Sequence, residues 1–258
     1  MSACHSFDPK GYRVTTQHTP LLQEAGQFRV HTGIGFNHIE MMGAISPVKY
    51  VGVVGSTYTN SKGFSKEWGF GGYYPWKSNF VTEAYFIMGE SNYRDYKDKT
   101  YSSYWSSNEA KTRYVDDLEF SYKKRALQVN VGYVTKKFKL SIGTNWTAAY
   151  YDFFKYQTVI WDKEDYRHQF FTLTSDTTYA FGKKRLDVLS IAPSVSFCFN
   201  EFMIQTQLSL STFVGATPPV PFESDFIRSA MFSTSFGWHF IPSEHRARQV
   251  KKKALKEG

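Results

Sequence analysis

Residues 125–146 read RALQVNVGYVTKKFKLSIGTNW, and this stretch decides the fold. On both sides of the basic turn VTKK, apolar residues alternate with small or polar ones, which is the period of a β-strand with two different faces. The stretch therefore predicts a β-hairpin with one apolar and one polar face. Such a hairpin suits a soluble β-sandwich, and it equally suits the wall of a barrel in a lipid bilayer.

The composition narrows the class of protein. The chain has 258 residues, of which 18% are aromatic, and its mean hydropathy is −0.43. No run of apolar residues is long enough for a transmembrane helix, which needs about 20. The search for a long apolar run does not detect a transmembrane barrel, because polar residues that face its interior alternate with the lipid-facing ones along each strand.

The same alternation recurs along the chain in segments of about ten residues, the length that crosses a bilayer as a tilted strand. Clear examples are QFRVHTGIGF at 27–36, FMIQTQLSLST at 202–212 and AMFSTSFGWHF at 230–240. In the last of these, every second residue is aromatic or apolar up to Phe240. Counting all such segments predicts about ten strands, within a range of about 8–12.

The connections between these segments fall into two alternating classes. The short ones are SPVK, PWKSN, VTKK and CFNE, and the long or variable ones cover 59–66, 90–117, 150–185 and 213–229. Outer-membrane barrels have short turns at the periplasmic rim and long loops at the extracellular rim. We therefore expect an all-β fold, an antiparallel up-and-down transmembrane barrel with both chain ends on the periplasmic side.

The alternative is a soluble sandwich or barrel, whose polar face would carry dense Lys and Glu. The off-face positions here are instead mostly Gly, Ser, Thr, Asn and Gln, which suit a narrow barrel interior. This favours the membrane barrel. The polar residues predicted to line its lumen are Arg29, His31, Glu67, Glu83, Gln128, Asn130, Lys139, Asn145, Gln205, Gln207 and His239.

Three segments resemble the small outer-membrane β-barrel proteins of Bacteroidota, many of which are lipoproteins. They are HTPLLQEAGQFRV at 18–30, GAISPVKYVGVVGS at 43–56 and IAPSVSFCFNEFMIQTQLSLS at 191–211. The last predicted strand also resembles the terminal assembly signal of outer-membrane proteins, except that the chain runs on beyond Phe240. The resemblance implies a location in the cell outer membrane more than it implies an activity.

We predict three regions along the chain. Residues 1–26 are expected to be a periplasmic segment, residues 27–240 the barrel, and residues 241–258 a basic periplasmic tail. The opening MSACHS is similar to a bacterial lipidation signal with Cys4 as the modified residue, but the preceding signal peptide is missing. Either the signal has been removed or the match is accidental.

The sequence gives no support for catalysis. The seven histidines have neither HExxH nor CxxC companions, and no GxSxG motif is present. Paired charges such as Asp116 with Asp117 lie in polar stretches where solvation explains them. We therefore expect no enzymatic activity, no cofactor and no metal site.

The leading functional expectation is a structural or accessory subunit of an outer-membrane complex for secretion, assembly or uptake. Its partners would be outer-membrane lipid and other outer-membrane or periplasmic proteins, and no nucleic acid. Tyr and Trp among small polar residues are typical of protein-binding loops. The predicted contact residues are Tyr93, Tyr96, Tyr101, Tyr104 and Trp105 in the outer connection, and Lys251, Lys252 and Lys253 in the tail. A narrow channel and, less favoured, an outer-membrane enzyme are the alternatives.

Overall fold

The structure is a computed structural model of the whole chain. It describes residues 15–35, 38–103, 110–163, 172–214, 229–247 and 250. The strands are β1 (Phe28–Gly35), β2 (His38–Ile45), β3 (Val51–Asn60), β4 (Gly63–Pro75), β5 (Phe80–Ser103), β6 (Ala110–Val134), β7 (Phe138–Lys163), β8 (Thr172–Phe181), β9 (Lys184–Phe199), β10 (Phe202–Val214) and β11 (Ser229–Phe240).

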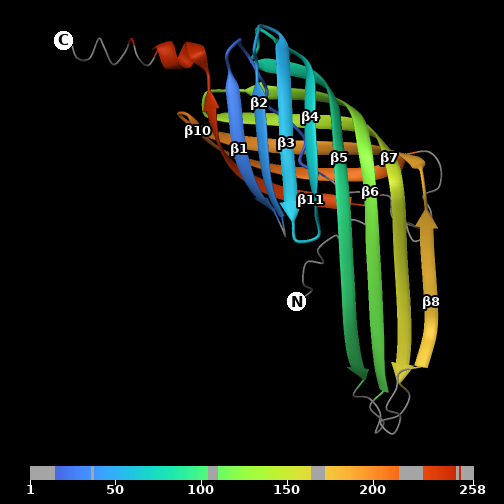
Figure 1. Cartoon of the computed structure of the whole chain (residues 1–258). Helices are drawn as coiled ribbons and strands as arrows, with labels where there is room; N and C mark the ends of the chain where they lie inside the picture. Colours follow the sequence, from blue (N-terminus) through green and yellow to red (C-terminus); the bar gives the residue numbers. More distant parts are fainter. Residues whose placement is uncertain are drawn as a thin grey trace.

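Ten of these eleven strands close into an antiparallel barrel (Figure 1). The first and last strands pair along their length, from Phe28 opposite Phe240 to Gly35 opposite Ser233. β6 pairs with β7 and β7 with β9, which completes the ring, while β8 pairs only with β7 in the described part of the chain. The predicted ten-stranded, up-and-down barrel is confirmed.

Three strands are far longer than a bilayer requires. β5, β6 and β7 have 24, 25 and 26 residues, whereas about 9–11 residues span the hydrocarbon core. Their outer parts leave the barrel as a sheet, which β8 completes by pairing with Phe154–Asp162 of β7 (Figure 1). We call this sheet the extension; it comprises residues 95–103, 110–118, 152–163 and 172–181.

The extension shows that the prediction of long loops in the two longest connections was wrong. Most of residues 90–117 and 150–185 are strand rather than loop, and β3 and β4 are separated by only residues 61 and 62 in place of a loop over 59–66. Outside the bilayer both faces of a sheet can meet water, so the strands no longer need an apolar row. Their Ser, Lys and Asp residues therefore led to the prediction of loops, although their Tyr, Thr and Val residues favour strands.

The two faces of the barrel wall are chemically opposite. Along β6 the exposed Leu127, Val129 and Val131 point outward, while Gln128 and Asn130 are 1% and 0% exposed and point inward. A polar interior and an apolar exterior reverse the usual order of a water-soluble protein, and a barrel surrounded by lipid requires this reversal. The hairpin at residues 125–146 thus has its apolar face on the outside of a transmembrane barrel.

Aromatic residues form girdles at both ends of the apolar band. At the rim with the short turns, here called the short-turn rim, Tyr74 packs on Trp76 with ring centroids 4.9 Å apart, and Phe80 packs on Tyr133 at 5.2 Å. At the opposite rim, which carries the extension, Trp68 and Trp146 are exposed on the outer face. Such girdles mark the two membrane–water interfaces of transmembrane barrels.

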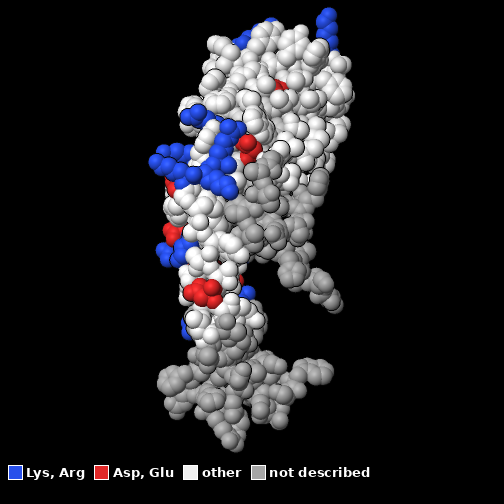
Figure 2. Space-filling model, turned by 90° about the vertical axis from the view of Figure 1, so that its right-hand side faces the viewer, with Lys and Arg blue, Asp and Glu red and all other residues white. Residues whose placement is uncertain are grey.

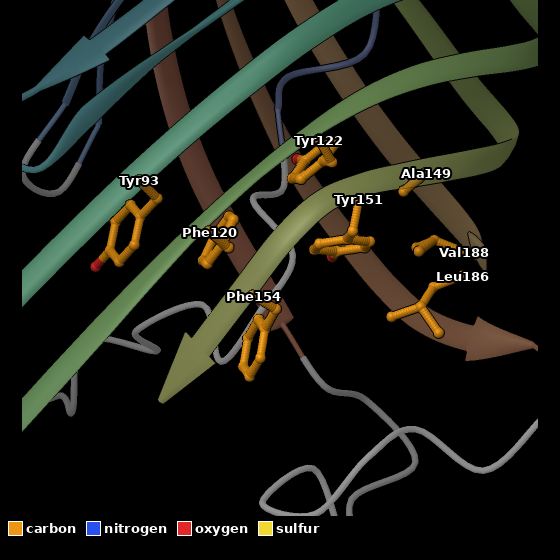
Figure 3. Packing of buried hydrophobic residues seen from close by; sticks show 8 residues of the cluster. All are labelled: Tyr93, Phe120, Tyr122, Ala149, Tyr151, Phe154, Leu186 and Val188. Atoms are coloured by element: carbon orange, nitrogen blue, oxygen red, sulfur yellow. The ribbon is translucent and has the colours of Figure 1, made fainter. Parts of the chain in front are cut away.

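A buried aromatic cluster lies on the inner side of the wall where the barrel meets the extension (Figure 3). Phe120 is at its centre and stacks with Tyr93 and Phe154, at centroid distances of 5.1 and 6.3 Å. Its members are Tyr93, Phe120, Tyr122, Ala149, Tyr151, Phe154, Leu186 and Val188. This cluster gives the base of the extension an apolar core.

Beyond β11, residues 242–247 form a short helical segment at the short-turn rim. Among the residues that the structure describes, no helix combines the length and the hydropathy needed to cross a membrane.

Candidate functional site: a plugged lumen

The lumen of the barrel is occupied by the chain's own N-terminal segment. Residues 16–22 are all buried, and their hydrogen bonds go to inward side chains of the wall. We call residues 15–22 the plug. This placement corrects the expectation that all of residues 1–26 lie in the periplasm, because the backbone of the plug finds its hydrogen-bond partners inside the barrel.

The plug is held chiefly by amide side chains that replace the partners a neighbouring strand would provide. Gln207 of β10 accepts a hydrogen bond from the Gln17 N–H at 2.8 Å and donates one to the Gln17 carbonyl at 3.2 Å. From β6, Gln128 and Asn130 both donate to the His18 carbonyl. A buried backbone group without such partners would be costly, so these amides make the enclosed segment tolerable.

Arg29 of β1 fixes the middle of the plug. Its guanidinium donates to the carbonyls of Thr19 and Pro20 and to the Gln205 side chain. Gln205 in turn donates to the Thr19 hydroxyl at 3.2 Å. The cation thus lies between two neighbouring backbone carbonyls, and a single side chain ties the plug to both β1 and β10.

At the short-turn end, the plug is anchored by a carboxylate and by apolar packing. The Leu22 N–H donates to Glu83 Oε1 at 2.7 Å, and the Tyr85 hydroxyl donates to the same oxygen at 3.2 Å. Leu21 packs with Val81 and Val134 in a small buried cluster. Leu21 also has a φ of 49°, a left-handed conformation that is strained for this residue type.

At the other end, the plug meets an ion pair inside the lumen. Lys124 of β6 lies 2.5 Å from Glu67 of β4, and the side chains are 1% and 3% exposed. Lys124 also donates to the Thr15 hydroxyl at 3.2 Å. The pair therefore satisfies two buried charges, and Lys124 also ties Thr15 of the plug to β6.

Glycines on the inner face of the wall leave the space that the plug fills. A Cβ added to Gly132 would collide with the Leu21 side chain, and one added to Gly143 would collide with Gln17. A Cβ at Gly52 would meet Leu22 and Tyr85. These residues lie inside strands, where Gly is unfavourable unless something approaches closely, and here that approach is made by the plug.

The structure places the predicted lumen residues on the inner face of the wall. His31 is half-buried, and its Nδ1 lies 2.9 Å from the Ser235 hydroxyl. The others are buried: Arg29, Glu67, Glu83, Gln128, Asn130, Lys139, Asn145, Gln205, Gln207 and His239. His239 lies opposite Arg29 in the sheet.

The predicted contact residues differ in where the structure places them. Tyr96 is 59% exposed on the extension, but Tyr93 is 3% exposed within the aromatic cluster, so Tyr93 does not lie on the outer surface as predicted. Tyr101 belongs to β5. The remaining positions lie outside the described residues: Cys4, Tyr104, Trp105, Lys251, Lys252 and Lys253.

Sequence reasoning missed the plug itself. The signal was present, because residues 14–23, VTTQHTPLLQ, carry no Asp, Glu, Lys or Arg in a chain in which 21% of residues are charged. A periplasmic linker would normally be charged and solvated, whereas an uncharged segment with paired leucines suits an enclosed site. Within the described ranges, no group of His, Cys, Asp and Glu is arranged to hold a metal ion.

Comparisons with known proteins found no matching family model and no matching curated protein. Among solved structures, the KdgM porin is 10% identical, with 83% of this chain and 99% of that chain covered at a TM-score of 0.35. The NanC porin is 10% identical, with 83% of this chain and 98% of that chain covered at a TM-score of 0.35. The CymD monoaromatic hydrocarbon channel is 7% identical, with 85% of this chain and 89% of that chain covered at a TM-score of 0.26. The chain is similar to these barrels in architecture, at low identity.

Proposed function

We propose that this chain is an accessory barrel of the bacterial outer membrane, closed to ions by its own plug, which binds a partner protein through its extension. The observation that carries the proposal is the filled lumen. A barrel of about eight strands has an interior just wide enough for side chains, and here a ten-stranded wall also encloses residues 16–22. The functional surface is then the outside of the molecule.

The outer membrane is the membrane that fits this architecture. A closed sheet leaves no strand edge unpaired in lipid, and barrels of this kind are characteristic of outer membranes. On this proposal the short-turn rim faces the periplasm and the extension faces the exterior. Lipidation of Cys4 stays a prediction, since that residue lies outside the described part of the chain.

The extension has the form of a protein-binding element. In the described chain, β4 stops pairing with β5 at Tyr93, and β8 has only β7 as a neighbour, so the sheet has two open edges. Open edges bind other chains by adding a strand. The outer faces carry exposed Tyr96 and an ion pair in which Arg113 lowers the pKa of Asp98.

The partner is tested by affinity purification from the native membrane. Two variants are compared: the full chain, and a trimmed chain in which residues 95–118 and 152–183 are each replaced by a two-residue turn. The flanking residues are register partners, Arg94 opposite Glu119 and Tyr151 opposite Lys184, so the barrel can close without the extension. We expect a stoichiometric partner to co-purify with the full chain and not with the trimmed chain. Recovery of the full chain without any partner would refute the proposal.

A narrow channel is the second candidate, and the chemistry of the plug favours it. The plug belongs to no strand of the sheet, and the wall around it is lined by amides, hydroxyls and charged groups. If the plug left, the lumen would keep a polar lining that water could fill. In this case the plug would act as a gate.

Planar-bilayer recordings separate the two candidates. We expect the full chain to show no discrete ion steps, and a chain lacking residues 1–22 to conduct steadily. Discrete steps from the full chain under an applied voltage would instead establish the channel. A chain without the plug that stays closed would show that the wall itself fills the lumen.

A further inference from the structure

Neighbouring strands place a row of charges on the outer face, directly above the apolar band at the extension rim. Following the register from β4 to β9, the row is Lys66, Glu90, Lys123, Tyr150 and Arg185. One step toward the middle of the bilayer, Trp68, Met88 and Arg125 follow on β4, β5 and β6.

One further step into the bilayer the row is entirely apolar, with Phe70, Phe86, Leu127, Trp146 and Leu189 in register. Figure 2 shows Lys and Arg side chains gathered beside a largely uncharged part of the barrel. The charges therefore lie at the level where lipid headgroups meet the hydrocarbon core.

The row contains an open groove with a volume of about 580 Å³. Lys66, Lys123, Arg125 and the carboxylate of Glu90 line it together with Trp68, Met88 and Tyr150. A groove with apolar walls and a few cationic groups at one level can receive both parts of an amphiphile. Its lower wall is continuous with the lipid-facing surface of the barrel.

The cations in this row differ in their ion pairs. Lys66 is paired with Glu90 at 2.8 Å, and Arg185 with Asp187 at 2.9 Å. Within the described residues, Lys123 and Arg125 form no ion pair with a carboxylate; Arg125 instead lies 5.7 Å from the centre of the Tyr150 ring. The guanidinium is thereby oriented, and its hydrogen-bond donors stay available for an anion.

We propose that this groove binds the phosphorylated headgroup of an outer-leaflet membrane lipid, with Lys123 and Arg125 holding a phosphate, Tyr150 orienting Arg125, and Trp68 and Met88 contacting the acyl chains. Planar guanidinium groups and ammonium groups are the side chains that bind phosphate. The apolar wall selects an amphiphile over a free anion. The inference rests on the outer-membrane placement of the barrel and is independent of the plug and of the partner protein.

The test is native mass spectrometry of the detergent-solubilised full chain titrated with bis-phosphorylated lipid A. The variant is Lys123→Gln with Arg125→Gln, and the matched control is Lys136→Gln with Lys137→Gln in an exposed turn at the short-turn rim. Two basic residues near an anionic lipid surface together contribute on the order of 2 kcal/mol, so we expect roughly thirtyfold weaker lipid binding by the variant. The control should bind as the unmodified chain does.

Two further measurements identify what is recognised. Lipid A from which the phosphates have been removed should bind as weakly to the unmodified chain as the phosphorylated lipid does to the variant. Inorganic phosphate should fail to displace the lipid at equal concentration. Equal binding by the variant and the control, or by the two forms of the lipid, would overturn the proposal; heat-modifiable gel migration verifies that each variant is folded.

Discussion

Gly132 shows how the absence of one side chain holds a whole segment in place. It faces the lumen within β6, and the Leu21 side chain occupies the space that a Cβ would take. Leu21 is 1% exposed and keeps a left-handed backbone conformation in order to reach this site. Steric fit at single positions therefore complements the hydrogen bonds along the plug.

Filling the hollow should destabilise the plugged state. We predict that Gly132→Leu lowers the free energy of unfolding by about 1–3 kcal/mol, because the added side chain and Leu21 compete for one space. The control is Gly182→Leu, since no residue that the structure describes lies within 4 Å of a Cβ added to Gly182. Urea unfolding in lipid vesicles measures both. Equal midpoints for the two variants would contradict the observed fit of Leu21.

Gln207 provides a second prediction at the scale of the residue. Gln207→Leu keeps the size of the side chain but leaves the buried N–H and carbonyl of Gln17 without their partner, which should cost about 1–3 kcal/mol. The same substitution in a chain lacking residues 1–22 should have a much smaller effect. A thermodynamic cycle of the two changes isolates the contact; additive effects would show that Gln207 does not hold the plug.

At the scale of the element, the sequence predicted the strands inside the bilayer well and those outside it poorly. In lipid, each strand must have one apolar face, so the alternation of apolar and polar residues around VTKK is enough to predict the two strands of that hairpin. The extension is free of that constraint. Buried aromatic residues such as Phe120 and Phe154 lie at its base, and Val115 and Val159 are buried farther out. The plug has no periodicity at all, because its partners are side chains rather than a neighbouring strand.

The aromatic cluster should contribute much of the stability of the extension as a sheet. Phe120 is 0% exposed and stacks between Tyr93 and Phe154. We predict that Phe120→Ala destabilises this region by about 3–5 kcal/mol, the usual cost of removing a buried Phe. Hydrogen exchange should then accelerate in the extension and not in the barrel. The exposed Tyr96→Ala is the control, and faster exchange throughout the barrel would contradict a local role.

At the scale of the whole molecule, the plug connects the barrel into a single unit. Its hydrogen bonds reach two groups of neighbouring strands on separate parts of the ring, β9, β10, β11 and β1 in one group and β5 and β6 in the other. The chain segment that precedes the first strand is therefore part of the barrel's core, and its polar lining and inner glycines serve that purpose.

The position of the plug is tested most directly by a disulfide between the plug and the wall. The hydroxyl oxygens of Thr16 and Ser233 lie 3.1 Å apart, so Thr16→Cys with Ser233→Cys, in a chain with Cys4→Ser and Cys198→Ser, should bring two thiols within bonding reach. The matched control pairs Thr16→Cys with Ser46→Cys, which is buried at the short-turn rim beside Gln27.

In intact membranes, mild oxidation should cross-link the Thr16–Ser233 pair almost completely and leave the control pair reduced. Failure of the first pair to cross-link, or equal cross-linking of both pairs, would contradict a plug that lies in the lumen as described.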